Sequence, residues 1–228
     1  MYRHIEGTVG SPDNAVAGLD FKANIAHTAQ VYGQLLLDEF VLAQIKKNTG
    51  YWANKYAVQL GLKYVDAFNI NNLDVQVEMN LVRPFTYSHN DTIDNYTHYN
   101  QPLAHPLGGN FREFIGIAKY QPKPKIYLDG RIIYYVQGLD SLGRNFGSNP
   151  LENYVSRPRD YGFFIGSGYR ASCLNASFTA SYELRENLFI DATALYRTFK
   201  VREANSTNNT SMLTVGIRWN MAKRDYDY

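Results

Sequence analysis

The chain has 228 residues, enough for one large domain or two small ones, and its formal net charge of +2 at pH 7 argues against a nucleic-acid-binding surface. The mean hydropathy is −0.38 and no run of about 18 apolar residues occurs, so the sequence excludes a bundle of membrane-spanning helices. The single cysteine, Cys173, excludes an internal disulfide and a metal site made of several cysteines.

Apolar and polar residues alternate with a period of two through most of the chain. In LDVQVEMNLV (73–82), Leu, Val or Met occupies every second position up to Leu81, and Asp, Gln, Glu and Asn lie between them. Successive side chains of a strand point to opposite faces, so this pattern predicts a strand with one apolar and one polar face. In chain order, the predicted strands span residues 2–8, 17–25, 28–38, 55–65, 73–82, 111–121, 126–137, 171–184, 188–197 and 211–221. Helical periodicity predicts only one short helical turn, within residues 39–48.

The links between the predicted strands alternate in length. Short links lie at 26–27, 67–72, 122–125 and 185–187, and longer links at 9–16, 39–53, 85–110, 138–169 and 201–210. An up-and-down antiparallel meander has its tight turns at one end and its variable loops at the other, and transmembrane barrels show this asymmetry strongly. The sequence therefore predicts a single all-β domain over residues 1–228.

Two architectures fit such a meander. In a soluble barrel or sandwich the apolar faces point inward, whereas in a membrane barrel they face lipid and the polar faces surround a lumen. Predicted strands of about ten residues or more match the 9–11 that cross a bilayer at a tilt. Tyr and Trp recur near the strand ends, as in the aromatic girdles of membrane proteins. The expected fold is therefore an antiparallel up-and-down transmembrane β-barrel with about ten strands in this chain.

The longest polar loop carries most of the candidate binding residues. The stretch YTHYNQPLAHPLGGNFRE (96–113) offers flat aromatic faces and planar donors and acceptors, which suit a hydroxyl-rich ligand such as a sugar. The alternative is a rigid loop that plugs the barrel. The candidate residues are Tyr96, His98, Tyr99, Asn100, Gln101, His105, Asn110 and Arg112. His98 and His105 lie seven positions apart with no Cys or acidic residue between them, so no metal or other cofactor is predicted.

A second candidate site follows in NYVSRPRDYG (153–162). Arg157, Arg159 and Asp160 could bind an acidic polysaccharide or could pair among themselves. Asp38 and Glu113 are the carboxylates that would support a glycan hydrolase, but the sequence forms no recognisable catalytic constellation around them. The chain is therefore predicted not to be an enzyme.

Four motifs together resemble the Wzi-type capsule-assembly family, in its Bacteroidetes branch of gliding-motility proteins. They are GSPDN (10–14), YGQLLLDEF (32–40), the 96–113 stretch and RPRDYG (157–162). The resemblance implies a bacterial outer-membrane barrel of roughly twice this many strands that contacts outer-membrane lipid, surface polysaccharide and other envelope proteins. The chain resembles only the C-terminal half of such a protein, and its first ten residues contain no signal-peptide core, so a fragment of a longer barrel is expected.

Three functions remain open from the sequence. The first is an outer-membrane barrel that binds or organises capsular polysaccharide, with a link to gliding motility. The second is a passive porin or a component of the secretion or gliding machinery, which the polar strand faces would suit. The third is a soluble β-barrel glycan hydrolase.

Overall fold

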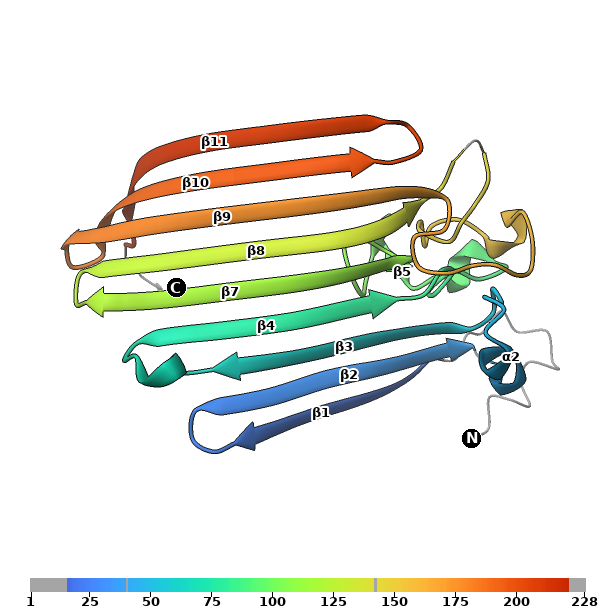
Figure 1. The fold of residues 1–228 in the computed structure, drawn as a ribbon, viewed down its shortest axis with the longest axis horizontal. Helices are drawn as coiled ribbons and strands as arrows, with labels where there is room; N and C mark the ends of the chain where they lie inside the picture. The colour runs from blue at the N-terminus through green and yellow to red at the C-terminus, as the bar shows by residue number, and fades with distance from the viewer. Residues whose placement is uncertain (1–15, 40, 142, 222–228) are drawn as a thin grey trace, which may run out of the picture.

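The computed structural model describes residues 16–39, 41–141 and 143–221. Nine strands form one antiparallel sheet in which each strand pairs with its neighbours in the chain (Figure 1). The strands are β1 (Ala17–Ile25), β2 (Ala29–Glu39), β3 (Lys55–Tyr64), β4 (Leu73–Val82), β7 (Phe111–Lys123), β8 (Ile126–Leu139), β9 (Tyr169–Arg185), β10 (Leu188–Val201) and β11 (Ser206–Trp219). A separate two-stranded hairpin consists of β5 (Thr97–His98) and β6 (Gln101–Pro102). The helical elements are α2 (Leu42–Lys47) and three single turns at η1 (Ala67–Asn69), η2 (Thr92–Asp94) and η3 (Tyr154–Ser156).

The predicted all-β, up-and-down antiparallel topology is confirmed for these residues. Nine of the ten predicted strands are present, and the predicted strand at 2–8 lies outside the described residues. The sheet is open, because β1 pairs only with β2 and β11 only with β10 in the part of the chain that the structure describes.

The predicted long link at 201–210 is wrong. β10 continues to Val201 and β11 already begins at Ser206, and these two residues pair across a tight turn. Residues 206–211 (STNNTS) are polar on both faces, so this part of β11 lacks the alternation that identifies a strand. Backbone pairing with β10 sets its conformation instead.

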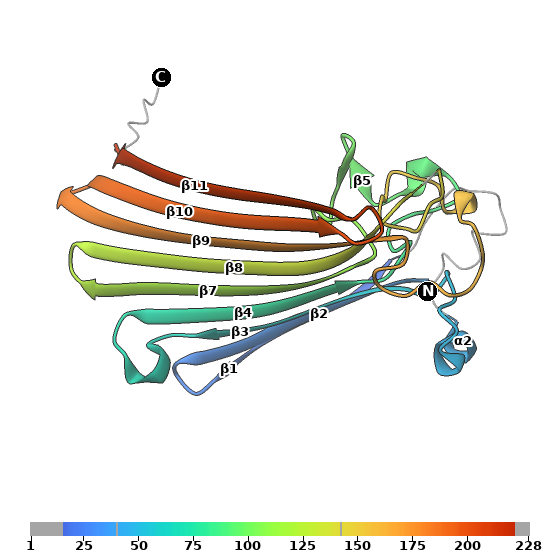
Figure 2. The same cartoon turned by 45° about the horizontal axis from the view of Figure 1, so that its top comes forward.

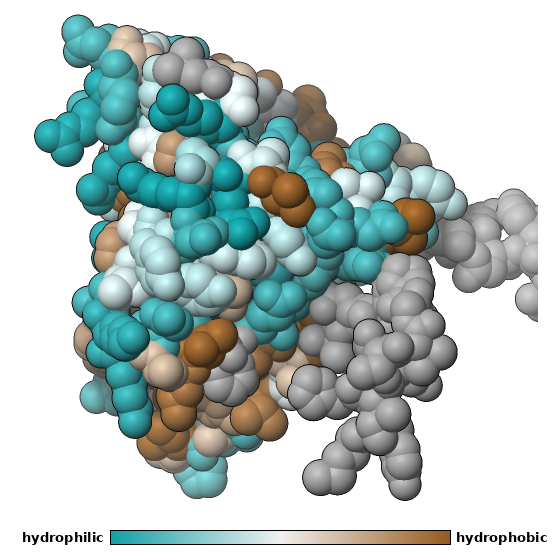
Figure 3. Space-filling model, turned by 90° about the vertical axis from the view of Figure 1, so that its right-hand side faces the viewer, coloured by the Kyte–Doolittle hydropathy of each residue, from teal (hydrophilic) through white to brown (hydrophobic). Residues whose placement is uncertain are grey.

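Most short turns are at one end of the sheet and the long loops at the other, as Figure 1 shows; the tight β10–β11 turn is at the same end as the long loops. The connections β1–β2, β3–β4, β7–β8 and β9–β10 are at one end, and the long loops 83–110 and 140–168 are at the other with α2. We call these the turn end and the loop end. Seen face on in Figure 3, the loop end is largely hydrophilic, with hydrophobic residues in smaller groups.

The two faces of the sheet differ in polarity along the paired strands. One register row reads Ala23, Val31, Leu62, Val77, Gly116, Ile132, Ala176, Tyr196 and Ser211, and the next row, on the other face, reads Lys22, Tyr32, Gly61, Glu78, Ile115, Ile133, Asn175, Arg197 and Thr210. We call these the apolar face and the polar face. Large side chains of the apolar face are open to solvent on strands far apart in the sheet, with exposures of 71% for Leu19, 55% for Ile132 and 69% for Val215.

Part of the polar face, in contrast, is covered by the 83–110 loop. At the loop end, Leu36, Ala57, Val82 and Phe111 form a row across four strands on the polar face. Tyr87 and Leu107 from the 83–110 loop pack on this row and complete a small buried core. The hairpin β5–β6 of the same loop projects from the sheet at this end (Figure 2). Among the described residues, no helix is long and apolar enough to span a membrane.

Candidate functional site

A pocket of about 310 Å³ lies between the 83–110 loop and the polar face near the loop end. Its polar lining comes from three amide side chains of the sheet, Gln34, Gln59 and Asn80, together with Tyr96 and His105 of the loop. Its apolar lining comes from the small core described above and from Leu103. Two of the predicted binding residues, Tyr96 and His105, therefore meet strand residues in one cavity.

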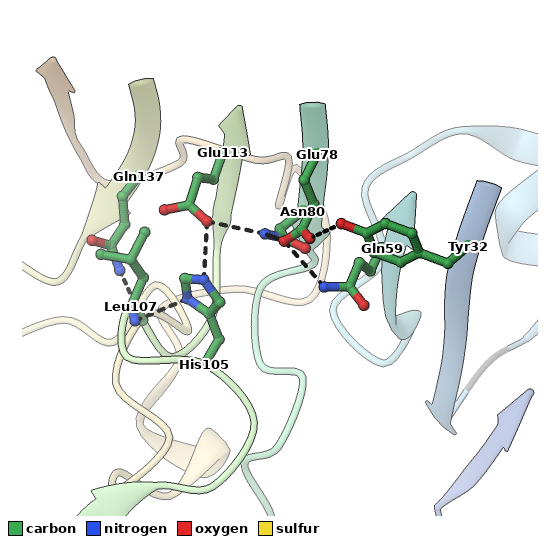
Figure 4. Close-up of polar contacts among 8 residues, drawn as sticks. All are labelled: Tyr32, Gln59, Glu78, Asn80, His105, Leu107, Glu113 and Gln137. Atoms are coloured by element: carbon green, nitrogen blue, oxygen red, sulfur yellow. Dashed lines mark hydrogen bonds and ion pairs between the residues drawn. The ribbon is translucent and has the colours of Figure 1, made fainter. Parts of the chain in front are cut away.

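A hydrogen-bonded network of side chains lies beneath this pocket (Figure 4). The Tyr32 hydroxyl donates to Glu78 Oε2 at 2.5 Å, and the Gln59 amide nitrogen donates to Glu78 Oε1 at 3.1 Å. Asn80 Nδ2 lies between two carboxylates, at 2.9 Å from Glu78 Oε1 and 3.1 Å from Glu113 Oε2. The register pairs Asn80 directly with Glu113 on adjacent strands, which explains why the two side chains meet.

His105 joins the loop to this network. Its Nε2 lies 3.0 Å from Glu113 Oε2, and its Nδ1 accepts a hydrogen bond from the Leu107 backbone N–H at 3.2 Å. A backbone N–H can only donate, so Nδ1 carries no proton, and Nε2–H is the donor to Glu113. The contact anchors the loop over the polar face, and Gln137 adds a second anchor by donating to the Leu107 carbonyl at 2.6 Å.

Gly61 allows Tyr32 to reach Glu78. It lies opposite Tyr32 on the adjacent strand, and a Cβ at this position would overlap the tyrosine ring and hydroxyl. The absence of a side chain therefore lets the ring lie flat across β3.

We expect Gly61→Ala to displace Tyr32, break its hydrogen bond to Glu78 and lower the free energy of unfolding by about 1–3 kcal/mol. Denaturant unfolding measures this loss. Gly116→Ala is the matched control, because a Cβ on Gly116 would meet nothing within 4 Å. Equal stability of the two variants would show that Tyr32 has room to move.

Two buried polar side chains tie the long loops together. Arg83 donates from Nη1 to the Phe163 carbonyl at 2.9 Å, from Nε to the Asn54 carbonyl at 3.2 Å and from Nη2 to the Tyr51 carbonyl at 3.2 Å. Burial lowers the pKa of Arg83 from its usual value. The guanidinium thus joins three segments of the loop end that are far apart in the sequence.

Asn110 makes the second tie. Its Nδ2 lies 2.9–3.0 Å from the carbonyls of Gly138, Phe146 and Ser167, and its Oδ1 accepts from the Gly166 N–H at 2.9 Å. The side chain is fully buried. Asn110 was predicted to bind ligand, but its amide is already bonded to the protein backbone, so its evident role is to position the loops.

The other residues predicted from the 96–113 stretch lie elsewhere. His98, Tyr99, Asn100 and Gln101 form the tip of the β5–β6 hairpin, where Tyr99 is 88% exposed. Tyr99 and Asn100 have positive φ angles of 47° and 58°, typical of a two-residue hairpin turn. Arg112 lies on the apolar face, on the opposite side of β7 from Glu113, so it does not reach the pocket.

Two of the three residues of the second predicted group, Arg157 and Asp160, pair with each other, as one of the sequence alternatives had it. Arg157 donates from Nε to Asp160 at 2.9 Å and lies 4.0 Å from the Trp52 ring centroid. Arg159 donates to the Gly162 carbonyl at 3.2 Å and lies over Phe163. Arg157 and Asp160 thus offer a charge pair to any ligand rather than two separate charges.

Sequence reasoning missed an aromatic cluster around a buried lysine. Lys55 is fully buried; its Nζ donates to the Ser88 carbonyl at 2.8 Å, lies 3.4 Å from Glu39 Oε2 and faces the rings of Trp52 and Tyr154. Burial, followed by the charge of Glu39, raises the pKa of Tyr154. The sequence gives no sign of this cluster, because Ser88 and Tyr154 come from the 83–110 and 140–168 loops, far in the chain from Trp52 and Lys55.

The carboxylate Asp38 is also part of this buried region. Its Oδ2 accepts from the Tyr87 N–H at 3.3 Å and lies 3.4 Å from His89 Nε2. Burial, with Tyr96 and Asp38 nearby, raises the pKa of Tyr87 to about 12. Asp38 and Glu113, the two carboxylates considered for a hydrolase, therefore bind different partners. The described residues contain no group of three or more His, Cys, Asp or Glu side chains placed to hold a metal ion.

Comparisons of the chain with protein-family models, curated proteins and solved structures find no match. The likeness to the Wzi-type family stays a prediction that rests on the four motifs.

Proposed function

We propose that this chain is part of an outer-membrane β-barrel that binds or organises surface polysaccharide without chemical turnover. The observation that carries the proposal is the contrast between the two faces of the sheet. Apolar side chains are exposed on strands from β1 to β11, whereas the 83–110 loop folds over the polar face and encloses a polar pocket there. Lipid is the solvent that suits such an apolar face, and a lumen suits the other.

The distribution of aromatic residues supports the same orientation. Tyr64, Tyr120, Tyr182 and Trp219 lie on the apolar face close to the turn end of their strands. Tyr and Trp prefer the boundary between acyl chains and water, because their rings are apolar and their polar atoms need a partner. The nine strands of the large sheet hold 9–17 residues, long enough to cross a bilayer at a tilt.

The polar pocket suits a ligand rich in hydroxyl groups. The amide nitrogens of Gln59 and Asn80 donate to Glu78 and Glu113, so their amide oxygens remain as acceptors. Sugar hydroxyls can donate to such oxygens while the Tyr96 ring supplies an apolar surface. The volume of about 310 Å³ lies at the lower end of the range of roughly 300–1,000 Å³ in which small molecules bind. One or two sugar units of a longer chain would fill it.

Binding fits these carboxylates better than glycoside hydrolysis. A glycosidase needs one protonated carboxyl group that donates to the leaving oxygen. Glu78 accepts from Tyr32, Gln59 and Asn80, and Glu113 accepts from Asn80 and His105. In these contacts both carboxylates accept hydrogen bonds, and neither donates the proton that a leaving group would need.

We expect the full-length protein, purified in detergent, to bind the capsular polysaccharide of its own cells, and Tyr96→Ala to weaken this binding about tenfold, the equivalent of 1.4 kcal/mol. Isothermal titration with polysaccharide fragments measures the affinity. Tyr99→Ala is the matched control, because Tyr99 lies at the exposed hairpin tip. The opposite order of effects would move the site to the hairpin.

The deletion strain gives an independent test of the proposal. Loss of polysaccharide binding in vitro should be accompanied by release of capsule from the cell surface. Normal capsule retention together with no measurable binding would remove the proposed function. In planar bilayers, steady ion conductance would favour the porin alternative, since the 83–110 loop is expected to obstruct the lumen.

A further inference from the structure

We infer that the loop end of the apolar face carries a binding site for the phosphate group of a lipid, formed by Arg170, Lys200 and Arg202. This inference rests on the proposed membrane placement, but it concerns the opposite side of the sheet from the sugar pocket. The three residues line a groove of about 380 Å³ together with Tyr134 and Val136.

The position of the basic residues along the strands is the first argument. Arg112 and Lys200 lie in one register row of the apolar face, which runs through Val136 and Ser172, and Arg170 lies two residues before Ser172. This row is at the loop end of the sheet. Toward the turn end, the same face continues with Ile132, Ala176 and Tyr196 and then with other apolar residues. Positive charge therefore sits directly at the edge of the apolar band.

The second argument is that this charge is not neutralised by carboxylates lining the groove, since no Asp or Glu lines it among the described residues. Glu203, which follows Arg202, uses its carboxylate to accept a hydrogen bond from the backbone N–H of Arg170 at 2.6 Å. Ser172, Ser206 and Thr207 add hydroxyl groups to the lining. Guanidinium and ammonium groups with hydroxyl donors are the usual partners of phosphate oxygens.

The third argument is the chemistry of the neighbouring surface. Tyr134 of the groove and Ile132 beside it are exposed at 43% and 55% and would contact acyl chains in a membrane. A phosphorylated lipid matches both parts at once, with its phosphate on the basic residues and its acyl chains on the apolar band. A free phosphate would use only the first part, so the occupant that the surface fits is a lipid.

The test uses the full-length protein, after flotation with phospholipid vesicles has established membrane insertion. Three probes are titrated in detergent: lipid A with its phosphates, enzymatically dephosphorylated lipid A, and inorganic phosphate. We expect the phosphorylated lipid to bind at least tenfold more tightly than either of the others. Arg170→Gln/Lys200→Gln should weaken it about thirtyfold, since each basic group near a membrane surface contributes roughly a factor of five.

The double variant Lys119→Gln/Arg131→Gln is the matched control, because it removes the same charge from the polar face of neighbouring strands. It should leave lipid binding unchanged. Equal affinity for the phosphorylated and dephosphorylated lipids would overturn the inference, and so would inorganic phosphate binding as tightly as the lipid. Failure to float with vesicles would remove the proposed membrane function and this site with it, whereas insertion without preference for the phosphorylated lipid would remove this site alone.

Discussion

Val215→Arg is expected to lower the stability of the folded protein in a bilayer by about 2–4 kcal/mol, the loss found for arginine on the lipid-facing side of a barrel near the bilayer midplane. Val215 lies on the apolar face of β11, is 69% exposed and is paired with Ala192 of β10. Under the proposed membrane placement this side chain contacts acyl chains, so a guanidinium there would have to be dehydrated or would deform the bilayer. Guanidinium titration of the protein folded in vesicles measures the change.

Thr214→Arg gives the control for this experiment. Thr214 immediately precedes Val215 in β11 and pairs with Thr193, so the added arginine would lie on the polar face, which the proposal assigns to the lumen. We expect the free energy of unfolding to change by less than about 0.5 kcal/mol, as for most substitutions at exposed polar positions. If the two variants were equally stable, both faces of β11 would be in water, and the membrane placement would be wrong.

Asn110→Asp is expected to lower the free energy of unfolding by at least about 3 kcal/mol. Three backbone carbonyls, those of Gly138, Phe146 and Ser167, face the Asn110 amide nitrogen at 2.9–3.0 Å. A carboxylate has nearly the same shape but offers these oxygens no donor, and each buried acceptor left without a partner costs about 1–3 kcal/mol. For a protein of this size, 3 kcal/mol corresponds to a decrease in Tm of about 6–12 °C.

Asn100→Asp is the control that separates the loss of the three carbonyl contacts from the effect of placing Asp at a positive φ angle. Asn100 also has a positive φ, 58° against 57° at Asn110, but it lies at the exposed tip of the β5–β6 hairpin. Asn100→Asp should change Tm by no more than about 2 °C. Thermal unfolding followed by circular dichroism compares the two variants. Equal losses would assign the effect to the backbone conformation and not to the three carbonyl contacts.

The strands could be predicted because their pattern is local. Alternation in 73–82 and 188–197 depends only on which face of the sheet each residue occupies, and every hydrogen bond of the ladder is then supplied by the neighbouring strand. Residues 206–211 lack this alternation, and pairing with β10 determines their extended conformation. Such pairing cannot be predicted from the sequence of one strand alone. The β5–β6 hairpin escaped prediction for a related reason, since each of its strands has only two residues.

The pocket could be predicted only in part. Tyr96 and His105 stood out because they lie in an unusual polar loop, but Gln59, Glu78 and Asn80 look like ordinary polar-face residues of a strand. Their participation depends on how β3, β4 and β7 align and on where the loop folds back. The sequence did offer one signal for Gln59, Glu78 and Asn80. Polar residues near the loop-end termini of consecutive strands lie close together when the strands pair and the residues share a face. Arg112 was predicted to bind ligand because it belongs to the same loop motif. It lies one residue before Glu113 in β7, so its side chain is on the other face of the sheet.

Among the described residues the sheet has an odd number of strands, which fixes the directions of its two edge strands. Nine antiparallel strands in chain order make β1 and β11 run the same way. These edges would form a parallel pair if they met directly. Joining them through antiparallel ladders alone requires an odd number of intervening strands, whichever polypeptide supplies them. This parity condition can be applied to any closed assembly that contains the sheet.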